Sequence, residues 1–275
     1  MNFRSNLLQG WWIEGKCKGS EGRKVVTQKP SSGKVPEQTP GPLQVLGEIG
    51  PLLAWGRYLY WADLSWRKYN QYMKEQEKGP ENYPLWIASV GEFLARLWIV
   101  IEGWQDLQLK DPYVDRVLQA RPDLVKVLKR FRHGMYHFQE NIVDERFLEL
   151  LNKTEYVYWT DVLHEAFCGY LWNRLNPTIG TIEQRRDIRD SLAAIVGWLP
   201  TDLPQAKAIL MREQIEEVRN SQTADSQAAK DLLQALTHAV KVSEEAVAGL
   251  RFLHNGWIQA IEEGTLPVAD PDSCP

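Results

Sequence analysis

Apolar residues recur at steps of three and four in one long segment after another, and this spacing constrains the fold more than any other feature of the chain. Breaks containing glycine and proline separate the segments, for example after residue 77 and around residues 176–180. The helical periodicity predicts an all-α protein. With 275 residues, of which 44% are hydrophobic, the chain is long enough to bury a substantial core.

Composition and periodicity divide the chain into four expected parts. Residues 1–45, rich in Gly, Lys, Ser, Pro and Gln, are expected to form a flexible basic arm. Residues 46–178 are expected to form a helical bundle, and residues 179–264 a C-terminal hairpin or subdomain of two or three helices that turns at 220–226. Residues 265–275 are expected to be a disordered tail. Within the bundle, helices are predicted at 51–77, 84–107, 121–139 and 156–175, with a turn and a short helix at 141–152.

Charge and cysteine content narrow the possible partners and compartments. A net charge of −4 argues against non-specific gripping of a long nucleic acid, so any RNA contact must be local. Three cysteines without a C-x-x-C pair indicate neither a disulfide framework nor a zinc ribbon, and we expect a reducing, cytoplasmic location. The most apolar run, residues 85–101, is interrupted by Glu92 and Arg96, so no membrane span is expected.

The predicted helix at residues 121–139, RPDLVKVLKRFRHGMYHFQ, combines an apolar stripe with a basic face. Pro122 suits the first helical turn, because its missing N–H has no intrahelical partner there. The apolar stripe consists of Leu124, Leu128, Phe131, Met135 and Phe138. The polar side carries Lys126, Lys129, Arg130, Arg132, His133 and His137. Such a face can hold phosphate.

Arg132 and His137 are separated by four residues, and the polar residue His133 follows the arginine directly. This arrangement resembles the R-x(4–6)-H motif of the HEPN superfamily, and FRHGMYHFQ is similar to the family's arginine–polar–x–x–aromatic–histidine run. The resemblance covers roughly residues 50–175 and implies a HEPN-like helical bundle, here with additional C-terminal helices, that forms a homodimer. Two departures are His133, where the family most often has asparagine, and Arg130, which stands six residues before His137 and is an alternative motif arginine.

The resemblance implies a metal-independent endoribonuclease that needs no cofactor and leaves a 2′,3′-cyclic phosphate. The chemistry requires a base for the ribose 2′-OH proton, which suits histidine, and a cation for the charge that builds on phosphate oxygens, which suits arginine. By resemblance, Arg132 and His137 are the catalytic pair and His133 is supporting. Such an enzyme would act as a toxin or as a defence or stress effector, with an inhibitory or regulatory protein partner.

A regular helix does not place the two motif residues on one face. At about 100° per residue, Arg132 and His137 lie about 140° apart around the axis. Gly134, between them, could loosen or kink the helix, because glycine is a poor residue for a helix interior. Alternatively, a two-fold dimer could bring two copies of the helix to one cleft, and the family resemblance favours the dimer.

Further residues are expected to support RNA binding. Glu102, near the edge of the apolar stripe on the preceding helix, could orient the arginine by a charge-assisted bond. Tyr136 could stack on unpaired bases of single-stranded or loop RNA. The remaining candidates for RNA contact are Lys126, Lys129, Arg130 and Gln139.

Less specific interpretations stand beside this one. The basic face could be ordinary solvated surface, or it could belong to a non-catalytic HEPN-like module that binds a nucleotide, an RNA or a partner protein. His133 and His137, four apart, could share a metal ion, but no third ligand is identifiable, and Gly134 and Met135 interrupt any H-E-x-x-H motif, so no metal is predicted. His164 lies among core positions and is interpreted as a packing histidine.

Overall fold

The computed structural model describes residues 42–76, 83–137, 140, 145–153, 155–221 and 224–265. The chain divides into two units, Met1–Gly41 and Pro42–Pro275. Most of the expected basic arm and nearly all of the expected tail lie outside the described residues. Helices and the connections between them make up everything described, with no strand, and this confirms the predicted all-α fold.

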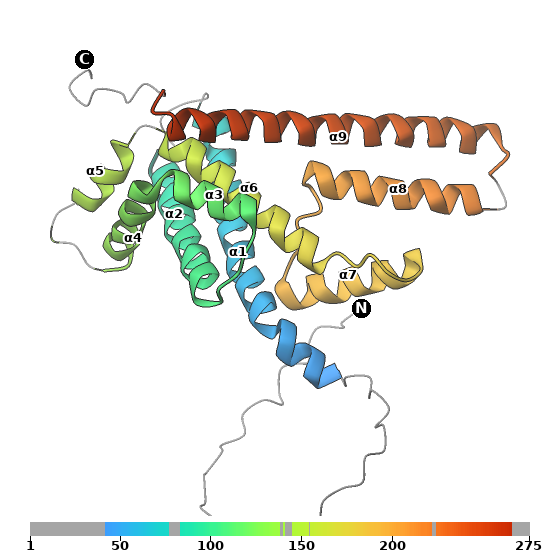
Figure 1. Ribbon diagram of the computed structural model, residues 1–275, viewed down its shortest axis with the longest axis horizontal. Coiled ribbons are helices and arrows are strands. Elements are labelled where there is room, and N and C mark those ends of the chain that lie inside the picture. Colours follow the sequence, from blue (N-terminus) through green and yellow to red (C-terminus); the bar gives the residue numbers. More distant parts are fainter. Residues whose placement is uncertain are drawn as a thin grey trace, which may run out of the picture. The chain divides into compact units, whose positions relative to one another are not determined.

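Nine helices follow one another in the described part of the chain (Figure 1). They are α1 (Pro42–Gln76), α2 (Tyr83–Asp106), α3 (Pro112–Ala120), α4 (Pro122–Tyr136), α5 (Glu145–Leu151), α6 (Tyr156–Leu175), α7 (Ile182–Val196), α8 (Pro204–Asn220) and α9 (Gln227–Glu262). The first six contribute most of the core, and α7 packs against α1.

The core between α1, α2 and α6 is built largely from aromatic rings. The buried Trp55 of α1 meets Trp104 of α2 and Phe167 of α6 at centroid distances of 5.9 and 5.6 Å. Its indole Nε1 donates a hydrogen bond of 2.9 Å to the carbonyl oxygen of Val100, which satisfies the one polar atom of the ring. This bond and these contacts fix the register of α1 against α2.

Helix α2 is the most apolar element, and α1, α4 and α6 pack against it. Its residues from Pro84 to Asp106 are long and apolar enough to cross a membrane by length and composition. Because 56% of the apolar 18-residue window within that stretch is buried inside the protein, its apolar character is used for packing between helices.

Helix α4 follows α3 after a single residue and begins with Pro122, as the proline rule predicts. The expected inward positions Leu124, Leu128 and Phe131 are fully buried, and Met135 is half-buried. Phe138, the last expected member of the stripe, lies outside the described residues. The apolar face of α4 is therefore inward over its full length, and its polar face is outward.

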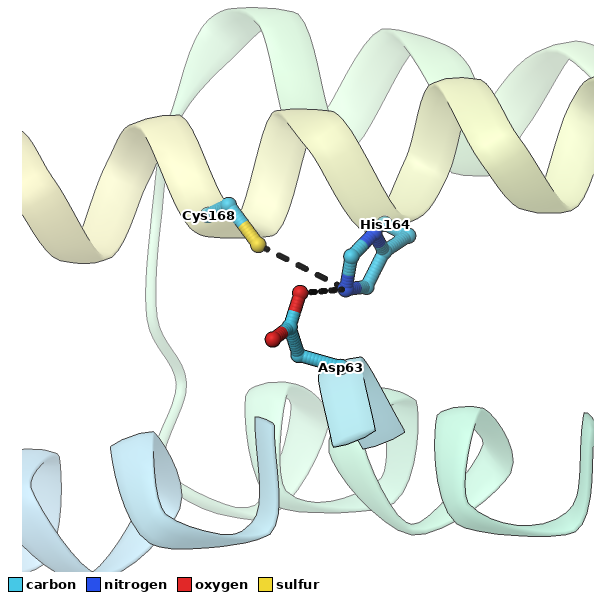
Figure 2. A group of neighbouring side chains, drawn as sticks. All are labelled: Asp63, His164 and Cys168. Atoms are coloured by element: carbon cyan, nitrogen blue, oxygen red, sulfur yellow. Dashed lines mark hydrogen bonds and ion pairs between the residues drawn. The ribbon is translucent and has the colours of Figure 1, made fainter. Parts of the chain in front are cut away.

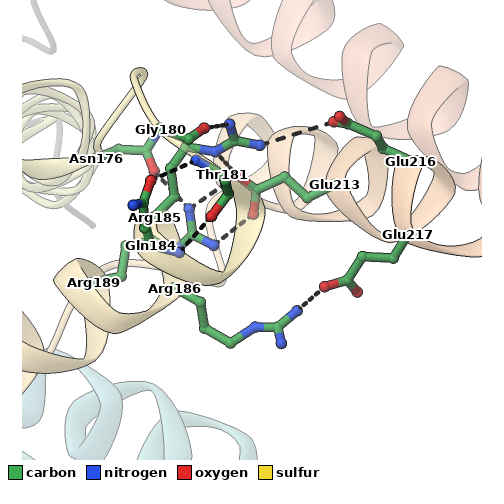
Figure 3. A network of polar contacts seen from close by, with 10 residues as sticks. All are labelled: Asn176, Gly180, Thr181, Gln184, Arg185, Arg186, Arg189, Glu213, Glu216 and Glu217. Carbon is green, nitrogen blue, oxygen red and sulfur yellow. Dashed lines mark hydrogen bonds and ion pairs between the residues drawn. The ribbon is translucent and has the colours of Figure 1, made fainter. Parts of the chain in front are cut away.

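Helices α7 and α8 are joined by buried ion pairs (Figure 3). Glu213 of α8 accepts hydrogen bonds from Arg189 at 2.5 Å and from Arg185 at 2.7 Å, both on α7. Burial alone would raise the pKa of Glu213, but the two guanidinium groups outweigh it and lower the pKa below its usual value. At neutral pH the charged carboxylate therefore ties the two helices together.

Helix α9 connects the C-terminal helices to the bundle (Figure 1). Toward its N-terminal end it runs beside α8, with an ion pair between Arg212 and Glu244. Toward its C-terminal end it packs on α3, where Glu262 receives two hydrogen bonds from Arg116 at 2.9 and 3.1 Å. Helix α8 ends at Asn220 and Ser226 caps α9, so the break between the two helices falls in the segment where the turn is expected.

Candidate functional site

The motif arginine lies beside the predicted carboxylate. A guanidinium nitrogen of Arg132 on α4 is 3.9 Å from a carboxylate oxygen of Glu102 on α2. The distance fits an ion pair and is too long for a hydrogen bond. The two side chains are 37% and 42% exposed, so the arginine is oriented by a neighbouring charge while its guanidinium stays accessible to solvent.

The two motif histidines lie together at the C-terminal end of α4. The helix runs through Gly134 and ends at Tyr136, and His137 has an extended backbone with φ −114° and ψ 140°. The ring centroids of His133 and His137 are 4.3 Å apart. The 140° separation expected for a continuous helix therefore does not apply, because His137 has already left the helix.

Two other basic residues of α4 contact different neighbouring helices. Arg130 forms an ion pair of 2.8 Å with Glu149 of α5. The ammonium of Lys129 lies 5.8 Å from the centroid of the Trp98 ring on α2, in a cation–π arrangement. Lys126 is exposed, and Gln139 lies outside the described residues.

Tyr136 lines an aromatic cavity beside the Arg132–Glu102 pair. The tyrosine is 54% exposed and borders a cavity of about 430 Å³. The other lining residues are Tyr58 and Trp61 of α1 and Arg96 and Ile99 of α2. Glu102 stands three residues after the lining residue Ile99 on α2, and Arg132 stands four residues before the lining residue Tyr136 on α4. The ion pair therefore lies about one helical turn from the cavity along the α2–α4 seam.

A second polar cluster lies inside the bundle, between α1 and α6 (Figure 2). Nε2 of His164 is 3.6 Å from a carboxylate oxygen of Asp63 and 3.6 Å from the sulfur of Cys168. All three residues are buried. His164, expected to be a packing histidine, is 5% exposed, and its ring stacks on Trp66 at 5.1 Å, but that expectation did not include its two polar neighbours.

Burial controls the protonation of this cluster. It lowers the pKa of His164 to about 4, so the ring is neutral at physiological pH. It also raises the pKa of Asp63, although Arg67 opposes this, and raises the pKa of the Cys168 thiol. The one sequence signal was the spacing of four between His164 and Cys168, which places both on one face of α6. Asp63 comes from another helix and could not be associated with them.

The described helices thus define an all-α protein with two polar sites of different character. One is an exposed surface of arginine, histidine and aromatic side chains along α2 and α4. The other is a buried Asp–His–Cys cluster between α1 and α6. No family model, curated protein or solved structure matches the chain.

Proposed function

We propose that the protein is a metal-independent endoribonuclease of HEPN type that cleaves single-stranded or loop RNA. The observation that carries the proposal is the arrangement at the end of α4, where Arg132, held beside Glu102, adjoins an aromatic cavity and two neighbouring histidines. These are the group types that metal-free cleavage of RNA requires: a base, a cation for phosphate and a surface for an unpaired base.

In the proposed reaction, His137 takes the proton of the ribose 2′-OH, whose oxygen then attacks the adjacent phosphorus. The bond to the 5′-oxygen of the next nucleotide breaks, and the products are a 2′,3′-cyclic phosphate and a 5′-hydroxyl. Arg132 stabilises the charge on the non-bridging oxygens, and His133 supplies the proton to the leaving oxygen. Glu102 acts on the reaction through the arginine that it orients.

Binding is assigned to the surface around this centre. A base would stack on Tyr136 in the cavity that Tyr58 and Trp61 also line. Lys126, Lys129, Arg130 and Gln139 would hold phosphates or base edges. We further propose a cytoplasmic homodimer, regulated by a protein partner, that acts as a toxin or as a defence or stress effector.

One observation favours the non-catalytic alternative. Glu102 and Glu149 accompany Arg132 and Arg130, so part of the positive charge on α4 is already neutralised. A module that binds a nucleotide or a partner, and cleaves nothing, would be compatible with this balance of charge.

The deciding experiment is cleavage of a mixed RNA pool in EDTA by the full-length protein and by Arg132→Ala and His137→Ala variants. We expect the wild type to produce cyclic-phosphate ends and each variant to lose at least about a hundredfold in rate. Exposed residues of the same types on other helices, Arg219 and His238, provide the matched controls Arg219→Ala and His238→Ala, which should keep full activity.

Circular dichroism in the same chelator keeps unfolding separate from loss of chemistry. Folded wild-type protein that binds RNA without cutting it would favour the non-catalytic module. Cleavage that persists in both α4 variants would remove Arg132 and His137 from the mechanism.

A further inference from the structure

The three donor atoms of the buried cluster converge on one point (Figure 2). The carboxylate oxygen of Asp63, Nε2 of His164 and the sulfur of Cys168 all lie within 4.8 Å of one another. They come from two packed helices and include none of the residues of the α4 site. One nitrogen, one oxygen and one sulfur donor are the ligand types that zinc takes in proteins.

The distance between His164 and Asp63 fits shared coordination better than a direct hydrogen bond. Nε2 of His164 is 3.6 Å from the Asp63 oxygen, whereas an N–H···O hydrogen bond spans about 2.7–3.2 Å. Two donors bound to the same tetrahedral zinc, each about 2.0–2.3 Å from the ion, are about 3.3–3.8 Å apart. The 3.6 Å between Nε2 and the Cys168 sulfur falls in the same range, and it is also the length of a hydrogen bond to sulfur.

Neighbouring side chains hold the donors in place. Arg67 donates a hydrogen bond of 2.6 Å to the second carboxylate oxygen of Asp63, which leaves the first oxygen facing His164. The imidazole is stacked on Trp66, and the Phe93 ring packs against it edge-to-face with the ring centroids 5.7 Å apart. Such outer contacts, which fix the orientation of ligands before the ion arrives, accompany metal sites in proteins.

The surroundings of Cys168 argue against a nucleophilic role for the same three residues. A reactive cysteine requires an accessible thiolate, favoured by a lowered pKa. Cys168 is buried, and burial raises the pKa of its thiol. A bound dication would instead deprotonate the sulfur directly, because metal coordination outweighs the cost of burying a lone thiolate.

A cavity of about 250 Å³ adjoins the cluster, lined by all three of its residues. We propose that Asp63, His164 and Cys168 bind one Zn²⁺ ion, whose fourth position faces this cavity and is taken by water or a small anionic ligand. With the Asp63 carboxylate and the Cys168 thiolate as ligands, two negative charges balance the ion. Three protein ligands with one open position are typical of zinc that binds an exogenous ligand.

The first test is metal content and cobalt substitution in the full-length protein. Protein purified without chelators or metal-affinity resin should contain close to one zinc per chain by elemental analysis. After removal of the metal, titration with Co²⁺ should produce a thiolate-to-cobalt charge-transfer band and the visible absorption of tetrahedral cobalt, both saturating at one equivalent.

Substitution of each proposed ligand tests whether that residue binds the metal. Cys168→Ser should abolish the charge-transfer band, and Asp63→Asn and His164→Gln should each weaken Co²⁺ binding by at least about tenfold. Asp161→Asn is the matched control, because Asp161 lines the same cavity but accepts its hydrogen bond from Trp66. A Cys17→Ser/Cys274→Ser protein keeps Cys168 as its single thiol and should retain the band.

A measurement on the wild type decides the question even if a ligand variant does not fold. Zinc X-ray absorption should show one sulfur and otherwise nitrogen or oxygen neighbours. The proposal is overturned if folded protein takes up no zinc or tetrahedral cobalt, if the zinc has no sulfur neighbour or more than one, or if the cobalt band survives Cys168→Ser.

Discussion

Arg130 and Arg132 are two positions apart on α4 and have different partners. Arg130 forms an ion pair with Glu149 of α5, and Arg132 lies beside Glu102 of α2. Two steps along a helix turn a side chain by about 200°, so one arginine faces the α2 seam and the other faces away from it. Of the two possible motif arginines, Arg132 is the one that adjoins the aromatic cavity, and the proposed chemistry therefore uses it.

Tyr136 provides a prediction at the residue scale, which rests on the proposed function. Replacing Tyr136 with alanine should weaken binding of single-stranded RNA by about tenfold or more, because stacking of one base on an aromatic ring contributes about 1–3 kcal/mol. Tyr136→Phe keeps the ring and should bind like the wild type. Binding can be measured without cleavage by fluorescence anisotropy with a short labelled RNA, if each protein also carries the His137→Ala substitution that removes the proposed base. Equal affinities of the alanine and phenylalanine proteins would show that the ring contacts no base.

At the scale of single helices, periodicity predicted the elements better than their ends. The bounds of α6 agree with the predicted 156–175, because its apolar residues are bounded on the C-terminal side by Asn176 and Pro177. Helix α1 begins at Pro42, not near Pro51 as predicted. Pro51, which would normally mark the start of a helix, lies inside it. Helix α4 ends three residues before the predicted 139. Helix α3 was not predicted, because nine residues give little periodicity.

The two candidate sites differ in how far sequence could anticipate them. Arg132, His133 and His137 lie on one short segment, so a local pattern was enough to select them. Asp63 and His164 come together only because α1 packs on α6, and a single sequence carries no signal for that pairing. Packing of α4 on α2 placed Glu102 beside Arg132, which the position of the glutamate near the edge of its apolar stripe had suggested.

Close packing of α1 on α2 leads to a prediction about glycine. A methyl group on Gly103 would lie 2.9 Å from Cδ1 of Trp55, whose ring is buried and held by its hydrogen bond to Val100. Because the indole cannot move aside, Gly103→Ala should destabilise the protein by about 1–3 kcal/mol. Chemical denaturation followed by circular dichroism measures the change.

Gly249 provides the control, since a methyl group there would meet nothing within 4 Å. Gly249→Ala should stabilise α9 by about 0.5–1 kcal/mol, because alanine has the higher helix propensity. A Gly103→Ala protein as stable as Gly249→Ala would contradict the packing described between α1 and α2.

At the scale of the whole described unit, α9 holds the bundle and the C-terminal helices together. The Tyr113 hydroxyl and Nδ1 of His254 share a hydrogen bond of 2.5 Å, and Ile258 is fully buried in the bundle core. The other end of α9 packs on α8, which α7 links to α1. Separation of the C-terminal helices from the bundle would therefore break contacts at two places.

Protonation of His254 should weaken the contact between α9 and α3. Burial lowers the pKa of His254 below its usual 6.5, so the unfolded chain binds a proton more readily than the folded one. Stability is therefore fully present above pH 6.5 and decreases as the pH falls from there toward the folded pKa, by at most about 1.4 kcal/mol per pH unit.

Hydrogen exchange of residues 250–262 on either side of pH 6.5, corrected for intrinsic rates, measures this effect. His254→Gln should remove the pH dependence at this end of α9. Exchange in α9 that depends on pH equally in wild type and His254→Gln would exclude His254 as the cause.

The contact between Tyr113 and His254 joins positions 141 residues apart. A ribosome adds about 5–20 residues per second, so α3 is made roughly seven to thirty seconds before its partner on α9. During that interval the side of α3 that α9 covers is open on the nascent chain. The newly made bundle is then most exposed to aggregation and to capture by chaperones, and the arrival of the last helix ends that period.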